Sequence, residues 1–187
     1  MSTTISIKNN FFILTGGPGS GKTSVLEAFE NCGYVVVPEV ARSIIKEQQS
    51  IGREATHTGN RIAFCDLMLN QSILDYKNHL IVPQTVFFDR GIPDLYGYAK
   101  RFCNGITEEI EQATKTYRYN PTVFLFPPWP EIYNEDTERK QDFNEAIDTY
   151  QVVKEAYKVC GYQIIEIPKT TINERVEYIL QRLIPIN

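Results

Sequence analysis

A glycine-rich run near the start of the chain combines residue types that bind phosphate. It fits the pattern G-x-x-x-x-G-K-[ST] and reads Gly16-Gly17-Pro18-Gly19-Ser20-Gly21-Lys22-Thr23. The apolar run 11–14 leads into it, and a helical pattern follows with Val25, Leu26 and Phe29 on one face. Glycines let backbone N–H groups curl around an anion at the positive end of a helix dipole. This order of strand, loop and helix favours a phosphate-binding loop over a glycine-rich turn without a ligand.

The loop residues have distinct expected roles around a nucleoside triphosphate. We expect the nucleotide to contact the run that ends one residue after the motif, namely Gly16, Gly17, Pro18, Gly19, Ser20, Gly21, Lys22, Thr23 and Ser24. Lys22 should reach the β- and γ-phosphates, and the Thr23 hydroxyl should ligate Mg²⁺. The guanine-specifying pattern Asn-Lys-x-Asp of GTPases does not occur in the sequence, which favours ATP.

Charged residues also follow the next two predicted strands, where a parallel sheet binds its ligands. Asp89 comes after the apolar run 86–88 and has the form of a Walker B aspartate, which would hold Mg²⁺ opposite Thr23. The alternative for Asp89 is a simple turn residue at a strand end. Glu39 and Arg42 would share a face if Glu39 starts a helix. The alternative for Glu39 is an acid favoured by the dipole at a helix N-terminus.

Arginine accompanies the acid at both of these strand ends. The forked guanidinium of Arg90, and that of Arg42, matches phosphate geometry and would bind a substrate phosphate beside Asp89. The alternative is a surface ion pair, which stabilises a protein by only ~0–1 kcal/mol. Many motor-type ATPases carry a second acid where this chain has Arg90, so the sequence argues against an efficient hydrolase.

The stretch 127–142 follows the fourth predicted strand and is a possible lid segment. Arg139 and Lys140 at the start of the next helix would swing over the phosphates and stabilise the charge of the transferred phosphoryl group. The alternative is a solvated, charged helix start. Trp129 and Tyr133 in the same stretch would either stack on a substrate ring or pack as part of a hydrophobic hinge.

The arrangement of apolar runs predicts an α/β fold. Five β-rich runs, each bounded by Gly, Pro or Asn, occupy residues 11–15, 34–38, 85–89, 122–126 and 162–167. Their near-continuous apolar character indicates burial on both faces, and helical patterns fill the gaps. We therefore predict one domain over residues 1–187, with a parallel five-stranded sheet covered by helices on both faces.

Three of the helical patterns are clear enough to place. One covers 61–77 with Ile62 on its apolar stripe, and one covers 143–160 with Ile147 on its stripe. The last opens with the capping box that starts at Thr171 and would bury Ile172.

Composition excludes several classes of protein. The net charge is −4, and there is no Lys/Arg block that would indicate a nucleic-acid partner. The N-terminus lacks the pattern of a signal peptide and no apolar run is long enough to span a membrane, so we expect a cytoplasmic protein without a membrane partner. The four cysteines lie far apart, which predicts reduced and mostly buried thiols, and the two histidines have no metal-ligand spacing.

Several further segments carry a family resemblance over nearly the whole length. They are TGGPGSGKTS at 15–24, VVVPEVARSII at 35–45, FFDRGIPDLYGYAK at 87–100, PPWPEIYNEDTERKQDF at 127–143, and GYQIIEIP followed by TINERVEYIL near the C-terminus. In this order they resemble a family of small predicted ATPases with an AAA-labelled P-loop domain. More distantly, they resemble the ribosylnicotinamide kinase domain of a bifunctional regulator of NAD biosynthesis.

The resemblance implies a nucleoside- or nucleotide-kinase-like fold and roles for individual residues. By similarity with deoxynucleoside kinases, Glu39 would be the base that takes the proton from a substrate hydroxyl. Asp89 would lie near Mg²⁺, Arg90 would contact the transferred phosphoryl group, and Arg139 would have the lid role. The leading hypothesis is an ATP-dependent kinase of an unknown small-molecule acceptor.

Two other functions stay open at this point. One is an ATPase or nucleotide-gated switch that acts on a partner protein, and the other is a non-catalytic nucleotide-binding module. A kinase requires a closed acceptor cavity between Glu39 and the phosphate loop, bounded by helix 61–77. A switch would leave this region open or filled.

Overall fold

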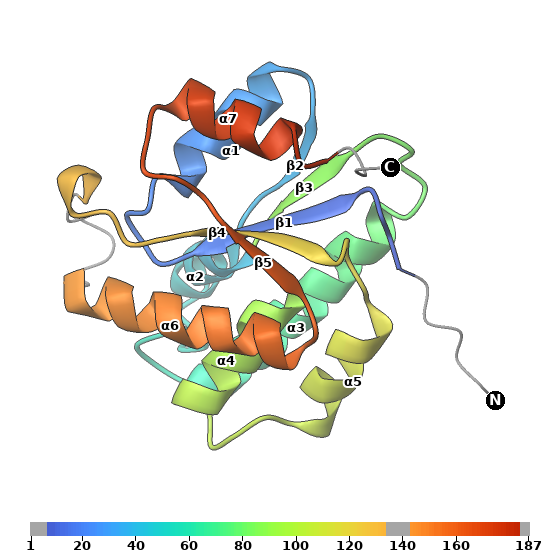
Figure 1. Cartoon of the computed structure of the whole chain (residues 1–187). Coiled ribbons are helices and arrows are strands. Elements are labelled where there is room, and N and C mark those ends of the chain that lie inside the picture. Colours follow the sequence, from blue (N-terminus) through green and yellow to red (C-terminus); the bar gives the residue numbers. More distant parts are fainter. Residues whose placement is uncertain (1–6, 134–142, 184–187) are drawn as a thin grey trace.

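A five-stranded parallel sheet forms the centre of the protein (Figure 1). The computed structural model describes residues 7–133 and 143–183. The strands are β1 (Phe11–Gly16), β2 (Val35–Val37), β3 (Val86–Asp89), β4 (Thr122–Phe126) and β5 (Gln163–Glu166). Their order is β2-β3-β1-β4-β5, and every pairing is parallel. Because β1 is the central strand, the glycine-rich loop that follows it opens at the middle of the carboxyl edge.

Helices cover both faces of this sheet. They are α1 (Lys22–Asn31), α2 (Val40–Ser50), α3 (Arg61–Asn78), α4 (Ile92–Phe102), α5 (Glu108–Thr116), α6 (Phe143–Val159) and α7 (Ile172–Leu180), with a 3-10 turn η1 (Pro130–Ile132). Helices α1 and α7 lie together on one face, whereas α3, α4 and α6 lie on the other, as Figure 1 shows. The α/β fold with a parallel five-stranded sheet and helices on both faces is therefore confirmed.

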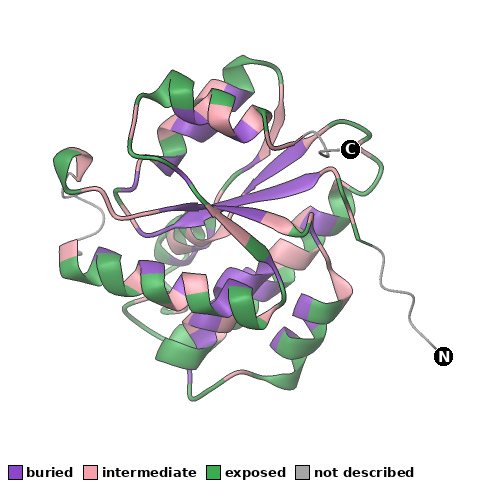
Figure 2. Cartoon of the chain, viewed as in Figure 1, coloured by how far each residue is buried: buried purple, intermediate pink, exposed green. Residues whose placement is uncertain are grey.

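Burial on both faces explains why the strands are apolar without alternation. In β1, Phe11 and Ile13 join the core under α3, α4 and α6, whereas Phe12 and Leu14 join the core under α1 and α7. The three middle strands β1, β3 and β4 form the buried centre of the molecule in Figure 2. A strand that packs on both faces must be apolar at every position, which is typical of parallel sheets.

The predicted strands agree with the observed ones to within one residue at each end. The capping box at the start of α7 is also confirmed, since the Thr171 hydroxyl accepts from the Glu174 N–H at 3.4 Å and the Glu174 carboxylate accepts from the Thr171 N–H at 3.2 Å. Two helices, α4 and α5, were not predicted individually, although Thr107 caps α5 and acidic residues fill its first turn.

Some individual burial predictions were wrong. Ile62, Ile147 and Ile172 are exposed, because each lies beyond the contact edge of its helix although its spacing fits the apolar stripe. All four cysteines are free thiols as expected, but Cys32 is exposed because it caps the C-terminus of α1. No helix within residues 7–133 and 143–183 has the length and apolar character needed to cross a bilayer.

The core under α1 depends on the ring of Phe87. This ring is fully buried and stacks on Phe29, with 4.1 Å between the ring centroids. We predict that Phe87→Ala lowers the free energy of unfolding by about 3–5 kcal/mol, the usual cost of removing a buried ring. Urea denaturation measures the change, and Ile81→Ala, at a side chain that is 91% exposed, is the matched control. An equal decrease in the free energy of unfolding in both variants would contradict this description of the core.

Candidate functional site

The glycine-rich loop has the backbone geometry of a phosphate-binding loop. Gly21 is the N-cap of α1 and has φ 76°, and Gly19 has φ 67°, both in the left-handed region that favours glycine. A Cβ at Gly19 would also lie 2.4 Å from the Tyr133 ring, so a larger residue does not fit. The Ser20 hydroxyl donates to the Gly17 carbonyl at 2.9 Å and closes the loop. The loop therefore presents backbone N–H groups at the N-terminus of α1.

This loop forms one wall of a cleft of about 690 Å³. Its lining combines the loop with three other segments: Gly17, Pro18, Gly19, Ser20, Gly21, Lys22, Thr23, Ser24, Glu39, Arg42, Arg90, Trp129, Ile132, Tyr133, Thr170, Thr171, Ile172 and Arg175. The volume falls within the usual range of small-molecule sites, roughly 300–1,000 Å³. The sequence-predicted loop residues thus lie in one cleft together with Glu39, Arg42 and Arg90, while Gly16 ends β1 behind it.

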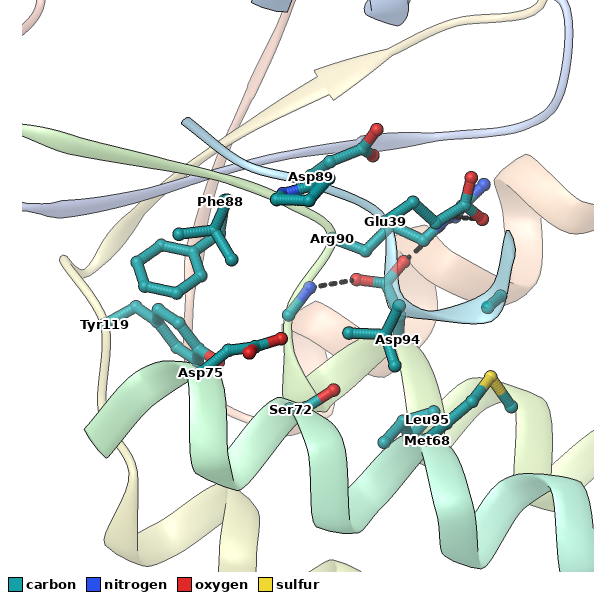
Figure 3. Close-up of a pocket in the computed structure, with 15 residues that line it drawn as sticks. Glu39, Met68, Ser72, Asp75, Phe88, Asp89, Arg90, Asp94, Leu95 and Tyr119 are labelled. Carbon is teal, nitrogen blue, oxygen red and sulfur yellow. Dashed lines mark hydrogen bonds and ion pairs between the residues drawn. The ribbon is translucent and has the colours of Figure 1, made fainter. Parts of the chain in front are cut away.

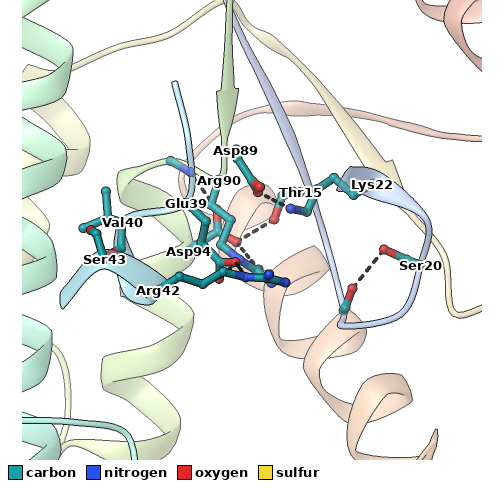
Figure 4. Close-up of polar contacts among 12 residues, drawn as sticks. Thr15, Ser20, Lys22, Glu39, Val40, Arg42, Ser43, Asp89, Arg90 and Asp94 are labelled. Atoms are coloured by element: carbon teal, nitrogen blue, oxygen red, sulfur yellow. Dashed lines mark hydrogen bonds and ion pairs between the residues drawn. The ribbon is translucent and has the colours of Figure 1, made fainter. Parts of the chain in front are cut away.

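Lys22 and Asp89 form an ion pair beneath the loop (Figure 4). Both side chains are at most 10% exposed. Thr23 is exposed to the cleft, so the chain offers one carboxylate and one hydroxyl as oxygen ligands. Across the described residues no three His, Cys, Asp or Glu side chains cluster as a metal site. This set fits Mg²⁺, which binds through one or two protein oxygens and takes the rest from water and phosphates.

Arg90 connects the carboxyl end of β3 to two acids. Its Nε donates to Glu39 Oε1 at 3.0 Å, and its Nη1 donates to Asp94 Oδ1 at 3.2 Å (Figure 4). Burial alone would lower the pKa of the guanidinium, but the charges of Glu39, Asp94 and Asp89 raise it above its ordinary value. Arg90 is also a non-glycine residue in the left-handed region, with φ 72°. Such strained residues concentrate at functional sites.

Glu39 is the N-cap of α2 and pairs with two arginines. Its carboxylate accepts from Arg90 and, at 3.3 Å, from Arg42 Nε. The expected proximity of Glu39 and Arg42 on one helical face is confirmed by this contact. Two guanidinium groups therefore contact the Glu39 carboxylate beside the phosphate loop.

A second, smaller cavity of about 40 Å³ adjoins the cleft (Figure 3). Glu39 and Arg90 line both spaces. Helix α3 supplies Met68, Ser72 and Asp75 to its far wall, and Phe88 and Tyr119 supply aromatic surface, as Figure 3 shows. The cavity therefore lies between Glu39 and helix α3, whereas the acceptor cavity was expected between Glu39 and the phosphate loop with this helix as its boundary.

Sequence reasoning missed Asp94, which is 8% exposed and central to the site. Its Oδ1 accepts from the Thr15 hydroxyl at 2.5 Å, and its Oδ2 accepts from the Gly91 N–H at 2.9 Å and the Tyr157 hydroxyl at 2.5 Å. It also fixes the first turn of α4, with Pro93 beside it. The sequence signal for Asp94 was its place in the first turn of a helix, after Gly91 and next to Pro93.

Sequence reasoning also missed Arg175, in the first turns of α7. It is 4% exposed, lines the cleft, and donates from Nη1 to the Gly21 carbonyl at 3.3 Å. Its guanidinium lies 5.3 Å from the centroid of the Trp129 ring. Trp129 and Tyr133 both line the cleft. This position is consistent with either expected role, stacking on a substrate ring or packing in a hydrophobic hinge. Arg139 and Lys140 lie outside the described residues, as does most of the segment 127–142.

These features define a P-loop nucleotide-binding protein. A family model described as an AAA domain matches residues 11–175. The chain therefore belongs to this AAA domain family, as the sequence resemblance indicated. No curated protein matches the sequence.

Several solved structures, two of them kinases, share this fold at low identity. The NadR protein in complex with NR has a TM-score of 0.68 and 15% identity, over 91% of this chain and 49% of NadR. The deoxyadenosine kinase from M. mycoides, with products dCMP and dCDP bound, has a TM-score of 0.58 and 13% identity, over 92% of this chain and 98% of the kinase. Shikimate kinase from Acinetobacter baumannii in complex with shikimate has a TM-score of 0.53 and 12% identity, over 97% and 94%.

Asp94 gives a direct test of the buried network. We predict that Asp94→Asn lowers the free energy of unfolding by about 3–5 kcal/mol, because it removes a counter-charge of the buried Arg90 and places amide hydrogens against hydroxyl donors. The control is Asp148→Asn, which breaks an exposed pair with Arg101 that should be worth about 1 kcal/mol or less. Urea titration of both variants measures the difference. Similar midpoints would show that Asp94 does not organise the site.

Proposed function

We propose that this protein catalyses ATP- and Mg²⁺-dependent transfer of a phosphoryl group to a hydroxyl of a small molecule. The observation that carries the proposal is that Glu39 and Arg90 line both the phosphate-loop cleft and the cavity beside it. A kinase requires this arrangement, in which donor and acceptor meet at one acid and one cation.

Each charged residue has a role in the proposed reaction. Lys22 and the loop N–H groups bind the β- and γ-phosphates, and Thr23 and Asp89 hold Mg²⁺. Glu39 accepts the proton of the acceptor hydroxyl. Arg90 and Arg42 offset the charge of the transferred group. The lid role of Arg139 stays a prediction from the sequence.

Helix α3 would contribute the acceptor-binding groups. Ser72 and Asp75 are one turn apart and both line the cavity. A cavity of about 40 Å³ holds only a few water molecules, so the acceptor must widen it. The NR and shikimate complexes of the structural neighbours support a small hydroxylated acceptor of this kind.

The small volume of this cavity also favours a second candidate function. A nucleotide-gated switch that hydrolyses ATP and acts on a partner protein requires no acceptor space. The two functions differ in what they require of Glu39, because only a kinase requires it as the base for an acceptor.

Glu39 therefore separates the two functions. We predict that Glu39→Gln leaves the ATP dissociation constant within about threefold of wild type and lowers acceptor-dependent kcat by roughly 10²–10⁴-fold, the usual contribution of a general base. Calorimetry measures the affinity. A coupled ADP assay with deoxyadenosine, nicotinamide riboside and shikimate as probe acceptors measures the transfer.

The matched control is Glu47→Gln, which makes the same change at an exposed position on the same helix. This variant should behave like wild type in both assays. Undiminished phosphoryl transfer by Glu39→Gln would contradict the assignment of the base. ATP hydrolysis without any acceptor, equal in wild type and Glu39→Gln, would support the switch instead.

A further inference from the structure

Arg175 is a buried cation that forms no ion pair with any acid of the described residues 7–133 and 143–183. Its Nε is also buried and has no hydrogen-bond partner among those residues. The hydrogen bond from Nη1 to the Gly21 carbonyl is directed to a neutral group.

Two other cations of the cleft, the buried Lys22 and the partly buried Arg90, differ from Arg175 in this respect. Lys22 pairs with Asp89, and Arg90 pairs with Glu39 and Asp94. The acid next to Arg175 in sequence is Glu174, but its carboxylate is exposed and bonded to Thr170 and Thr171. Burying an unpaired charge costs several kcal/mol, so buried cations normally have a partner.

The position of Arg175 indicates where its partner belongs. Its guanidinium packs so closely against the phosphate loop that a Cβ at Gly21 would lie 2.7 Å from Nη1. Trp129 supports the guanidinium from the η1 side. Both residues line the same cleft as Lys22 and Thr23. The cleft is thus the space from which a counter-ion can reach Arg175.

We propose that Arg175 is a nucleotide-binding residue and that the polyphosphate of the bound nucleotide is its missing counter-charge. This inference rests on the proposed nucleotide site and adds to it a cation from α7, held by Trp129 and the Gly21 carbonyl. In the free protein, burial without a counter-charge lowers the pKa of the guanidinium from its ordinary value. Binding of a polyanion relieves this cost, so part of the nucleotide affinity comes from Arg175.

A purely structural role makes the opposite prediction for stability. If Arg175 only braces the loop through Gly21, its removal should destabilise the free protein and leave the affinity of the folded protein intact. If it is an uncompensated cation, an apolar side chain of similar length should leave the free protein equally or more stable and weaken nucleotide binding.

The test compares Arg175→Met and Arg175→Lys with the control Arg182→Met. Arg182 lies two residues after the end of α7, packs over the Tyr178 ring and donates to the Tyr178 carbonyl, but it does not line the cleft. The probes are ATP, inorganic tripolyphosphate and adenosine, with affinities measured by calorimetry. Urea denaturation without ligand gives the stability of each free protein.

We expect Arg175→Met to weaken binding of ATP and of tripolyphosphate by about 10- to 100-fold, as for loss of a charged hydrogen bond, with adenosine unaffected. Its urea midpoint should equal or exceed that of wild type. Arg175→Lys should retain most of the tripolyphosphate affinity, and Arg182→Met should bind all three probes like wild type.

Three results would overturn the inference. One is a destabilised Arg175→Met with unchanged ATP and tripolyphosphate affinity, which would make Arg175 a loop brace. Another is a loss for ATP and adenosine but not tripolyphosphate, which would make it a base contact. The third is a wild-type protein that binds neither ATP nor tripolyphosphate, which would remove the proposed nucleotide site together with this role.

Discussion

The ion pairs of Arg90 hold together the three elements that form the floor of the site. Its guanidinium links β3 to Glu39 at the start of α2 and to Asp94 in the first turn of α4. Its backbone N–H donates to the Leu14 carbonyl of β1 at 2.9 Å, which ties the same residue to the central strand. The positive φ at Arg90 persists because these contacts determine its conformation from several sides. Loss of either acid would remove part of the charge compensation of this guanidinium.

In the free protein, the cations Lys22 and Arg90 beside the phosphate loop are already paired with acidic side chains. Asp89 pairs with Lys22 in the structure, although in the proposed reaction Lys22 turns to the phosphates and Asp89 to the metal. Nucleotide and Mg²⁺ would therefore exchange one buried ion pair for two new interactions at the same place. Arg175 has no such internal partner among the described residues, so its charge remains available to the ligand.

Much of the fold could be predicted from the sequence because its signals are local. Strands buried on both faces appear as apolar runs, and the phosphate loop fixes the turn between the first strand and α1. The pair of Glu39 and Arg42 could be predicted because residues three apart lie on the same face of a helix. The order of the strands in the sheet was not predicted from the sequence, because it depends on crossovers between segments far apart in the chain.

The missed site residues illustrate the same limit. Asp94 and Arg175 each look like an ordinary polar position on a helix, and only tertiary packing buries them. Asp94 had a local signal in its first-turn position after Gly91. Arg175 had none, because its contacts with Gly21 and Trp129 span 154 and 46 positions (175 − 21 and 175 − 129). Their burial followed from the fold and could not be derived from periodicity.

The most direct test of the proposed kinase activity is ATP consumption by the wild-type protein with Mg²⁺, measured with and without a panel of small hydroxylated molecules. The proposal predicts that ADP forms rapidly with one acceptor or one narrow class, with a phosphorylated product in equal amount, and only slowly without an acceptor. ADP formation at the same rate in every reaction, with inorganic phosphate as the product, would contradict it.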